Sequence, residues 1–235
     1  LFIVEKLKKL KLSKLCEFVH FCCTSEDINN LSYSLMLQRF LDIEFIPEVN
    51  FIQKNLNSLA KKYSKLSMLA FTHGQPASPT TLGKEFSNYS YRIKFHLDLI
   101  KTIKQKGKFN GASGNYNAHV VAEKKVNWET LSKKFVNSLG LDFSSHSTQI
   151  ELKDAMAFQL ANTHNLNNVL IDFAQDIWLL ISKNYLKQNL KAGEVGSSTM
   201  PHKVNPIDFE NAEGNLSVAN GLIIALKNKI QISRL

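Results

Sequence analysis

The sequence is poor in the residues that break helices and form tight turns. Ten Gly and five Pro stand among 235 residues, about half the usual share. Each tight turn between strands tends to need Gly, Pro or Asn, so this scarcity disfavours a turn-rich β-sandwich. Because 44% of the residues are apolar, collagen-like and disordered chains are also excluded. Long helices are therefore expected.

Cysteine and long apolar runs are scarce as well. The three cysteines, Cys16, Cys22 and Cys23, are odd in number and two are adjacent, which indicates no disulfide framework and favours a reducing compartment. No apolar run approaches the roughly 18 residues needed to span a bilayer. Residues 1–12 carry four Lys and one Glu, unlike the apolar core of a signal peptide. We expect a cytoplasmic protein with no membrane partner.

Negative charge is in deficit. The chain has 29 Lys and Arg against 20 Asp and Glu, a net charge of +9, which favours an anionic partner without identifying it. One interpretation is a basic helical scaffold that binds nucleic acid, with an affinity that depends strongly on salt. Such a scaffold should gather its lysines on one face, whereas here they are spread from Lys6 to Lys229. A small anionic metabolite is favoured instead.

Apolar residues recur at helical spacing over most of the chain. Pro47 is expected to kink or interrupt the first long helix, and Asn205 to cap the last one with Pro206 as its first residue. No strand-rich segment or internal repeat is evident, so the fold class is all-α, an elongated helical bundle. The expected helices cover residues 28–68, 80–105, 116–123, 128–139, 154–186 and 206–230, with loops at 71–79, 108–117 and 187–205.

Residues 196–206, Gly-Ser-Ser-Thr-Met-Pro-His-Lys-Val-Asn-Pro, form the most informative segment. Two hydroxyls, a cation and a carboxamide are delivered by a glycine-hinged loop to a helix N-terminus, an arrangement that suits a carboxylate ligand. The simpler interpretation is a surface loop that ends in a cap at Asn205. The segment resembles the signature G-S-S-x-M-P-x-K-x-N-P of the fumarase/aspartase superfamily at every fixed position.

Other segments resemble the bacterial-type adenylosuccinate lyase branch of that superfamily. The resemblance spans nearly the whole chain but only about half of the family's length, and the missing segments help to hold the nucleotide and its phosphate. We therefore expect the chain to be part of a longer protein. The segments are 20–30 (His-Phe-Cys-Cys-Thr-Ser-Glu-Asp-Ile-Asn-Asn), 72–81, 109–119, 148–151, 193–195 and 207–215.

Two candidates have structural interpretations of their own. Thr24 with Asp27 three residues later is a capping box, although a hydroxyl-rich helix N-terminus also suits a carboxylate. A lone histidine is more often structural than catalytic, but His73 lies on a loop with Gly and Pro and not on an apolar helix face. Glycines in residues 109–119 permit a close backbone approach to a ligand or to another helix.

The resemblance implies a lyase that releases fumarate from adenylosuccinate, leaving AMP, and from the succinyl-carboxamide ribotide (SAICAR), leaving AICAR, in purine nucleotide biosynthesis. The reaction is an anti β-elimination that needs no metal or other cofactor. Argininosuccinate lyase, fumarase and aspartase are the alternatives within the superfamily, and residues 24–30 and 73–81 argue against them. The resemblance implies that Ser197 is the base, with Ser198 as second candidate, and that His73 is the acid. Thr24, Ser25 and Gln149 would contact the carboxylates, with His119 a further candidate contact. Lys203 and Asn205 would stabilise the doubly charged intermediate.

The resemblance also implies a homotetramer. We expect residues 1–14 to end a missing N-terminal domain, residues 15–235 to form an incomplete central bundle, and a C-terminal domain to be absent. Thr24 and His73 flank a helical stretch of about 40 residues, roughly 60 Å if unbroken, and the next helix, of roughly 39 Å, separates His73 from Gln149. Active sites shared between subunits are therefore predicted.

Overall fold

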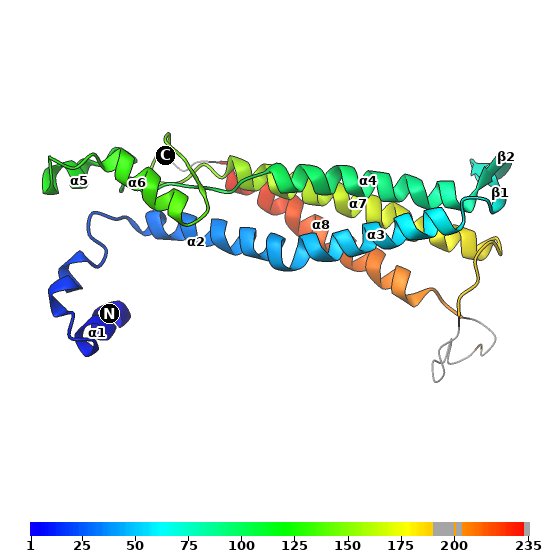
Figure 1. Ribbon diagram of the computed structural model, residues 1–235, viewed down its shortest axis with the longest axis horizontal. Coiled ribbons are helices and arrows are strands. Elements are labelled where there is room, and N and C mark those ends of the chain that lie inside the picture. Colours follow the sequence, from blue (N-terminus) through cyan, green and yellow to red (C-terminus); the bar gives the residue numbers. More distant parts are fainter. Residues whose placement is uncertain (190–199, 201–203, 233–235) are drawn as a thin grey trace. The chain divides into compact units, whose positions relative to one another are not determined.

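The computed structural model describes residues 1–189, 200 and 204–232 and is dominated by long helices (Figure 1). The predicted all-α class is confirmed, with short strands added. In chain order the elements are α1 (Phe2–Lys9), η1 (Ser13–Phe18), α2 (Ser25–Phe40), η2 (Leu41–Phe45), α3 (Ile46–Lys62), β1 (Ser67–Thr72), β2 (Gln75–Thr81), α4 (Leu82–Thr102), β3 (Lys106–Gly107), α5 (Asn117–Ala122), α6 (Trp128–Ser138), β4 (Asp142–Phe143), α7 (Asp154–Ser182) and α8 (Ile207–Ile230).

The chain divides into two compact units. Unit 1 contains Leu1–Leu41, Lys104–Met156 and the end of the chain from Ile230, and unit 2 contains Asp42–Ile103 and Ala157–Lys229. No helix in the part of the chain that the structure describes is long and apolar enough to cross a membrane.

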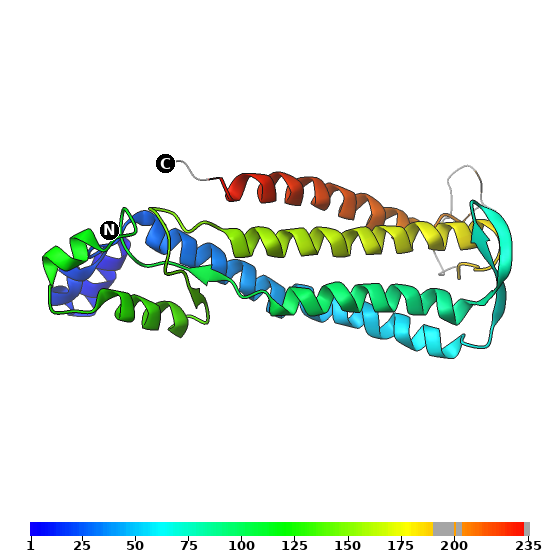
Figure 2. The ribbon, with the colours of Figure 1, turned by 90° about the horizontal axis from the view of Figure 1, so that it is seen from above.

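Unit 2 is a bundle in which α3, α4, α7 and α8 run alongside one another (Figures 1 and 2). On α4 the buried residues Phe86, Ile93, Leu97 and Ile100 repeat at helical spacing, so one apolar stripe faces the core. The polar side of α7 also contacts α4, since Asp176 on α7 accepts a hydrogen bond from the Tyr89 hydroxyl on α4. Each fully buried large apolar side chain contributes about 1.5–3 kcal/mol, so this stripe stabilises the unit.

Three asparagines join α7 to α8. Asn167 Nδ2 donates to Asn220 Oδ1 at 3.0 Å, and Asn220 Nδ2 donates to Asn168 Oδ1 at 2.9 Å. Among the described residues of α8, Asn220 is the buried one. The amide pairs thus define where α8 lies against α7, while most of the apolar side chains of α8 stay at least partly exposed.

A π-helical turn interrupts the first long helical segment just before Pro47. The turn covers Leu41–Phe45, and Pro47 lies in the first turn of α3 directly after it, so the missing N–H of Pro47 falls where the α-helical hydrogen-bond pattern is already interrupted. The predicted interruption at Pro47 is therefore confirmed.

A β-hairpin replaces the predicted loop at 71–79 and the predicted end of the first helix. Strands β1 and β2 pair antiparallel, with Thr72 opposite Gln75. The two turn residues, His73 and Gly74, have φ of 54° and 72°, and such a two-residue turn matches the twist of the strands. The helix prediction through residue 68 was wrong because Leu66 and Met68 also fit helical spacing, and periodicity does not separate a short strand from a helix end.

Unit 1 has a small core of its own around α2 and α6. Leu31, Val136 and Leu141 are buried together, with Phe109 packed against them. A Cβ on Gly107 would lie 2.4 Å from Leu31 Cδ2, so this glycine allows the short parallel pair β3–β4 to approach α2. The core anchors both ends of the segment from 108 to 141, in which the predicted short helices are confirmed as α5 and α6.

Candidate functional site

The N-terminus of α2 has the predicted capping box. Thr24 is the N-cap, and its backbone N–H donates to Asp27 Oδ2 at 2.9 Å. Thr24 is half-buried and Ser25 is exposed, so both hydroxyls lie at the end of the helix where N–H groups attract anions. The two interpretations of this segment, cap and carboxylate contact, are compatible in the structure.

Behind this cap lies a buried ion pair that the sequence did not predict. Lys108 Nζ is 2.9 Å from Asp27 Oδ1, and both side chains are 0% exposed. Asn30 holds the same region, since its Oδ1 accepts from the backbone N–H of Lys108 at 2.8 Å. The pair thereby fastens the loop that starts at residue 108 to the first turn of α2.

The glycine-bearing loop continues this network toward Gln149. The backbone N–H groups of Asn110 and Gly111 donate to the Asp27 carboxylate, at 3.1 Å for Asn110. Asn110 Nδ2 donates to Ser147 Oγ at 2.8 Å. Ser147 lies two residues before Gln149, whose side chain is exposed. Unit 1 therefore gathers the segments that carry three predicted carboxylate contacts, those of Thr24, Ser25 and Gln149.

Gly114 fits this arrangement because it lacks a side chain. Its φ is 79°, and a Cβ there would lie 2.5 Å from the Ser147 carbonyl oxygen and 2.8 Å from that of Thr148. The loop and the segment before Gln149 are thus in backbone contact, which is the close approach expected of these glycines.

We expect Gly114→Ala to destabilise the protein more than Gly140→Ala does. Gly140 also has a positive φ, 83°, but a Cβ there would meet only the side-chain end of Gln38, at 3.9 Å. Backbone strain alone should lower the free energy of unfolding by about 1–2 kcal/mol in Gly140→Ala, and the backbone clash should add about 1–3 kcal/mol in Gly114→Ala. Urea unfolding of both variants measures the difference; equal losses would contradict the contact with Ser147.

His119 is an interior residue and not an accessible contact. It is 1% exposed, and its ring lies 5.0 Å from that of Trp128 and 5.5 Å from that of Tyr116. Burial lowers its pKa, because an apolar surrounding disfavours the imidazolium. The expectation that His119 could contact a ligand is corrected by this burial.

His73 occupies the turn of the hairpin in unit 2. Its side chain is exposed, while the backbone around it is held: Lys183 Nζ donates to the Gly74 carbonyl at 3.4 Å and lies 4.6 Å from the centre of the Phe71 ring. Tyr185 adds an edge-to-face ring contact with Phe71. An exposed imidazole on a held turn is suited to proton transfer. The sequence offered no signal for the part played by Lys183.

Of the signature segment, the structure describes residues 200 and 204–206. Ser197, Ser198 and Lys203 lie outside the described residues. Asn205 is half-buried and directly precedes Pro206, and the Val204 carbonyl accepts from Gln188 Nε2 at 3.1 Å. Helix α8 begins at Ile207, one residue later than predicted, and the Pro206 carbonyl accepts from the N–H groups of Phe209 and Glu210.

No group of three or more His, Cys, Asp or Glu side chains within residues 1–189, 200 and 204–232 could hold a metal ion. The expectation that the chemistry needs no metal stays a prediction.

Comparison with curated proteins shows extensive similarity to adenylosuccinate lyases. The chain is 49% identical over 234 residues to that of Buchnera aphidicola subsp. Schizaphis graminum, 47% to that of Haemophilus influenzae and 45% to that of Escherichia coli K12. Each match covers 99% of this chain and 51% of the relative. The chain thus spans about half the length of the curated relatives it matches, and the resemblance seen in its motifs is confirmed.

A solved structure and a family model complete the comparison. The crystal structure of a fumarate lyase from Mesorhizobium sp. BNC1 matches with a TM-score of 0.72 at 19% identity, covering 91% of this chain and 47% of that one. This match shows a shared fold. The family model described as Lyase matches residues 2–221. Since that match takes in all but the first residue and the last stretch of the sequence, the chain belongs to the Lyase family.

Proposed function

We propose that the protein carrying this chain is an adenylosuccinate lyase. It would cleave adenylosuccinate to AMP and fumarate, and the succinyl-carboxamide ribotide to AICAR and fumarate. The observation that carries the proposal is the 45–49% identity to adenylosuccinate lyases over nearly the whole chain, with the superfamily signature intact at residues 196–206.

In the proposed reaction the C–H bond next to a succinyl carboxylate loses its proton to the Ser197 alkoxide. The electrons of that bond form the carbon–carbon double bond of fumarate, the C–N bond breaks, and His73 protonates the leaving nitrogen. A serine hydroxyl is a weak base at pH 7, so Lys203, nearby N–H groups and exclusion of water would have to stabilise the alkoxide. Ser198 is the second candidate for the base.

The remaining candidates would hold negative charge. Lys203 and Asn205 would stabilise the doubly charged intermediate formed when the proton leaves, and loss of one such donor typically lowers the rate about a hundredfold or more. Thr24, Ser25 and Gln149 would hold the succinyl carboxylates. Support comes from the hydrogen-bonded network of unit 1, which joins the segments of these three residues.

The test is fumarate release by the full-length protein, followed by ultraviolet absorbance. Adenylosuccinate and the succinyl-carboxamide ribotide are the expected substrates, whereas argininosuccinate, malate and aspartate should release no fumarate. Preferential cleavage of argininosuccinate would favour the alternative within the superfamily. Absence of fumarate from every substrate would contradict the proposal.

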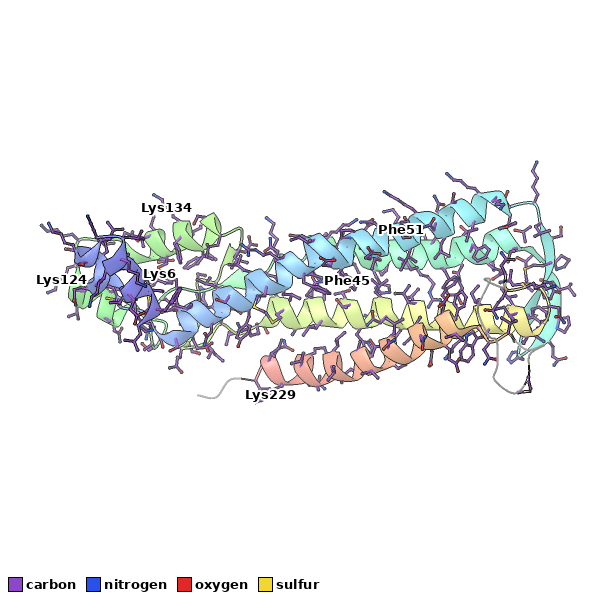
Figure 3. The ribbon with its side chains drawn as sticks, turned by 90° about the horizontal axis from the view of Figure 1, so that it is seen from below. Lys6, Phe45, Phe51, Lys124, Lys134 and Lys229 are labelled. Carbon is purple, nitrogen blue, oxygen red and sulfur yellow. The ribbon has the colours of Figure 1, made fainter. Side chains whose placement is uncertain are left out.

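The proposal includes a cytoplasmic location, no cofactor and no nucleic-acid partner. The exposed lysines labelled in Figure 3 lie on four different segments: Lys6 on α1, Lys124 after α5, Lys134 on α6 and Lys229 on α8. Along the sequence the lysines are spread from Lys6 to Lys229, which does not indicate a single basic segment that would follow a phosphate backbone. The assignment of residues 1–14 and 15–235 to different domains stays a prediction.

We also propose a homotetramer whose active sites draw on several subunits. On α8, Val218, Leu222 and Leu226 are 68%, 64% and 52% exposed, and their spacing of four residues puts them on one face of the helix. Exposed apolar faces of this kind favour association with another chain, and identical chains usually assemble with closed symmetry. Sharing of sites is supported by helix length, since a helical stretch of about 40 residues, roughly 60 Å if unbroken, lies between Thr24 and His73.

Shared sites predict complementation between inactive variants. Full-length His73→Ala and Gln149→Ala proteins, each inactive alone, should regain part of the wild-type activity when they are dissociated, mixed and reassembled. Recovery is expected because some sites of a mixed tetramer would contain neither substitution. Fumarate release measures it, and native mass spectrometry verifies that hybrids have formed. Hybrids without activity would mean that both residues come from one chain.

A further inference from the structure

The first turn of α2 contains a charge that opposes its proposed role. Asp27 lies three residues after Thr24, and its carboxylate accepts from the Thr24 N–H. Such an acid stabilises the helix, but it is also a negative charge close to the hydroxyls proposed to hold a substrate carboxylate. Like charges within a few ångströms of a site shielded from water repel strongly. The site therefore needs a compensating cation.

Lys108 supplies that cation from inside the protein. Its ammonium is fully buried, 2.9 Å from Asp27 Oδ1, and it also donates to the Gly111 carbonyl at 3.0 Å. A buried charge is stable only when it is paired and hydrogen-bonded, and Asp27 meets this condition with additional N–H donors from Thr24, Asn110 and Gly111. Because Lys108 has no contact with solvent, it acts on the site through Asp27.

We propose that Lys108 is a positioning residue for the lyase reaction. By neutralising Asp27 it lets the Thr24 and Ser25 hydroxyls donate hydrogen bonds to a substrate carboxylate, while the N–H groups of Asn110 and Gly111 hold the loop to Asp27. This inference rests on the proposed function. It differs from a purely structural role because it concerns the net charge behind the cap, which a paired substitution can restore without the lysine.

The experiment measures binding of fumarate and of AMP separately, by isothermal titration calorimetry on the full-length protein. Lys108→Met leaves the Asp27 carboxylate unpaired, and fumarate binding should weaken about tenfold or more, while AMP binding changes less than about twofold. The double variant Asp27→Asn with Lys108→Met has no charge on either side chain. It should bind fumarate within about threefold of wild type. Lys104→Met is the matched control, because Lys104 is 74% exposed, and it should leave both affinities unchanged.

If Lys108→Met does not fold, the fumarate affinity of the single variant Asp27→Asn tests the same inference. Asp27→Asn leaves an uncompensated cation behind the cap and should bind fumarate at least as tightly as wild type, and adding Lys108→Met should return the affinity toward wild type. Equal loss of fumarate and AMP binding in Lys108→Met, or no recovery in the double variant, would overturn the inference. Failure of the wild-type protein to bind fumarate or to release it from adenylosuccinate would instead overturn the proposed function.

Discussion

Ser197→Ala in the full-length protein is expected to reduce fumarate release from adenylosuccinate by about 10²–10⁴-fold, the contribution typical of a positioned base. Substrate should still bind, because the proposed carboxylate contacts at Thr24, Ser25 and Gln149 are unchanged. Steady-state turnover and substrate binding by calorimetry measure the two effects independently. A low turnover with near-normal affinity is the expected pattern for loss of a group that acts on the transition state.

Ser198→Ala is the matched control, since it removes the neighbouring hydroxyl and leaves Ser197. This variant should retain most of the wild-type turnover. If Ser197→Ala keeps more than a few per cent of wild-type turnover while Ser198→Ala loses it, the base is Ser198. Loss of binding together with turnover in Ser197→Ala would make Ser197 a binding residue.

His73→Ala should fail mainly in protonating the leaving nitrogen, so that C–N cleavage becomes the slow step. Turnover is expected to fall about 10²–10⁴-fold. Because Ser197 would remain, adenylosuccinate deuterated at the position of proton abstraction should still exchange its label with water. Mass spectrometry of recovered substrate measures the exchange, and turnover measures the cleavage.

The backbone conformation of the turn calls for a second variant at position 73. His73 has a positive φ of 54°, so His73→Ala could also disturb the hairpin, and His73→Asn tests this because asparagine tolerates such a backbone. Both variants should lose cleavage and keep exchange. Loss of exchange in both would identify His73 as the base or as a binding residue. His164→Ala, a substitution outside every family segment, should retain full activity.

Much of the helical architecture could be predicted because its signal lies within contiguous residues. The repeats of apolar side chains specified α4, α6, α7 and α8 to within a few residues of their observed bounds, and Pro47 marked the interruption of the first long segment. The capping box at Thr24 was evident from two residues three apart. Each of these features depends on local geometry, which a spacing pattern represents directly.

The hairpin shows where local patterns are insufficient. Apolar residues at 66, 68 and 69 suit either a helix end or a strand, and the choice is made by pairing between β1 and β2 and by the two positive φ values at the turn. Whether His73 would lie in a loop or in a held turn therefore depended on residues from 67 to 81 acting together and on the contact of Lys183 with Gly74.

By itself, the sequence determined the long helices and the identity of the candidate residues, since periodicity and motifs are properties of neighbouring positions. Only the tertiary structure decided that Lys108 and Asp27 form a buried pair, that His119 is interior, and that the loop from 108 to 114 contacts the segment before Gln149. Asn30 and Lys108 are 78 positions apart, and Asp27 and Gly111 are 84 apart. No spacing pattern relates residues so distant, because their contact arises only when the helices and loops between them pack into one core.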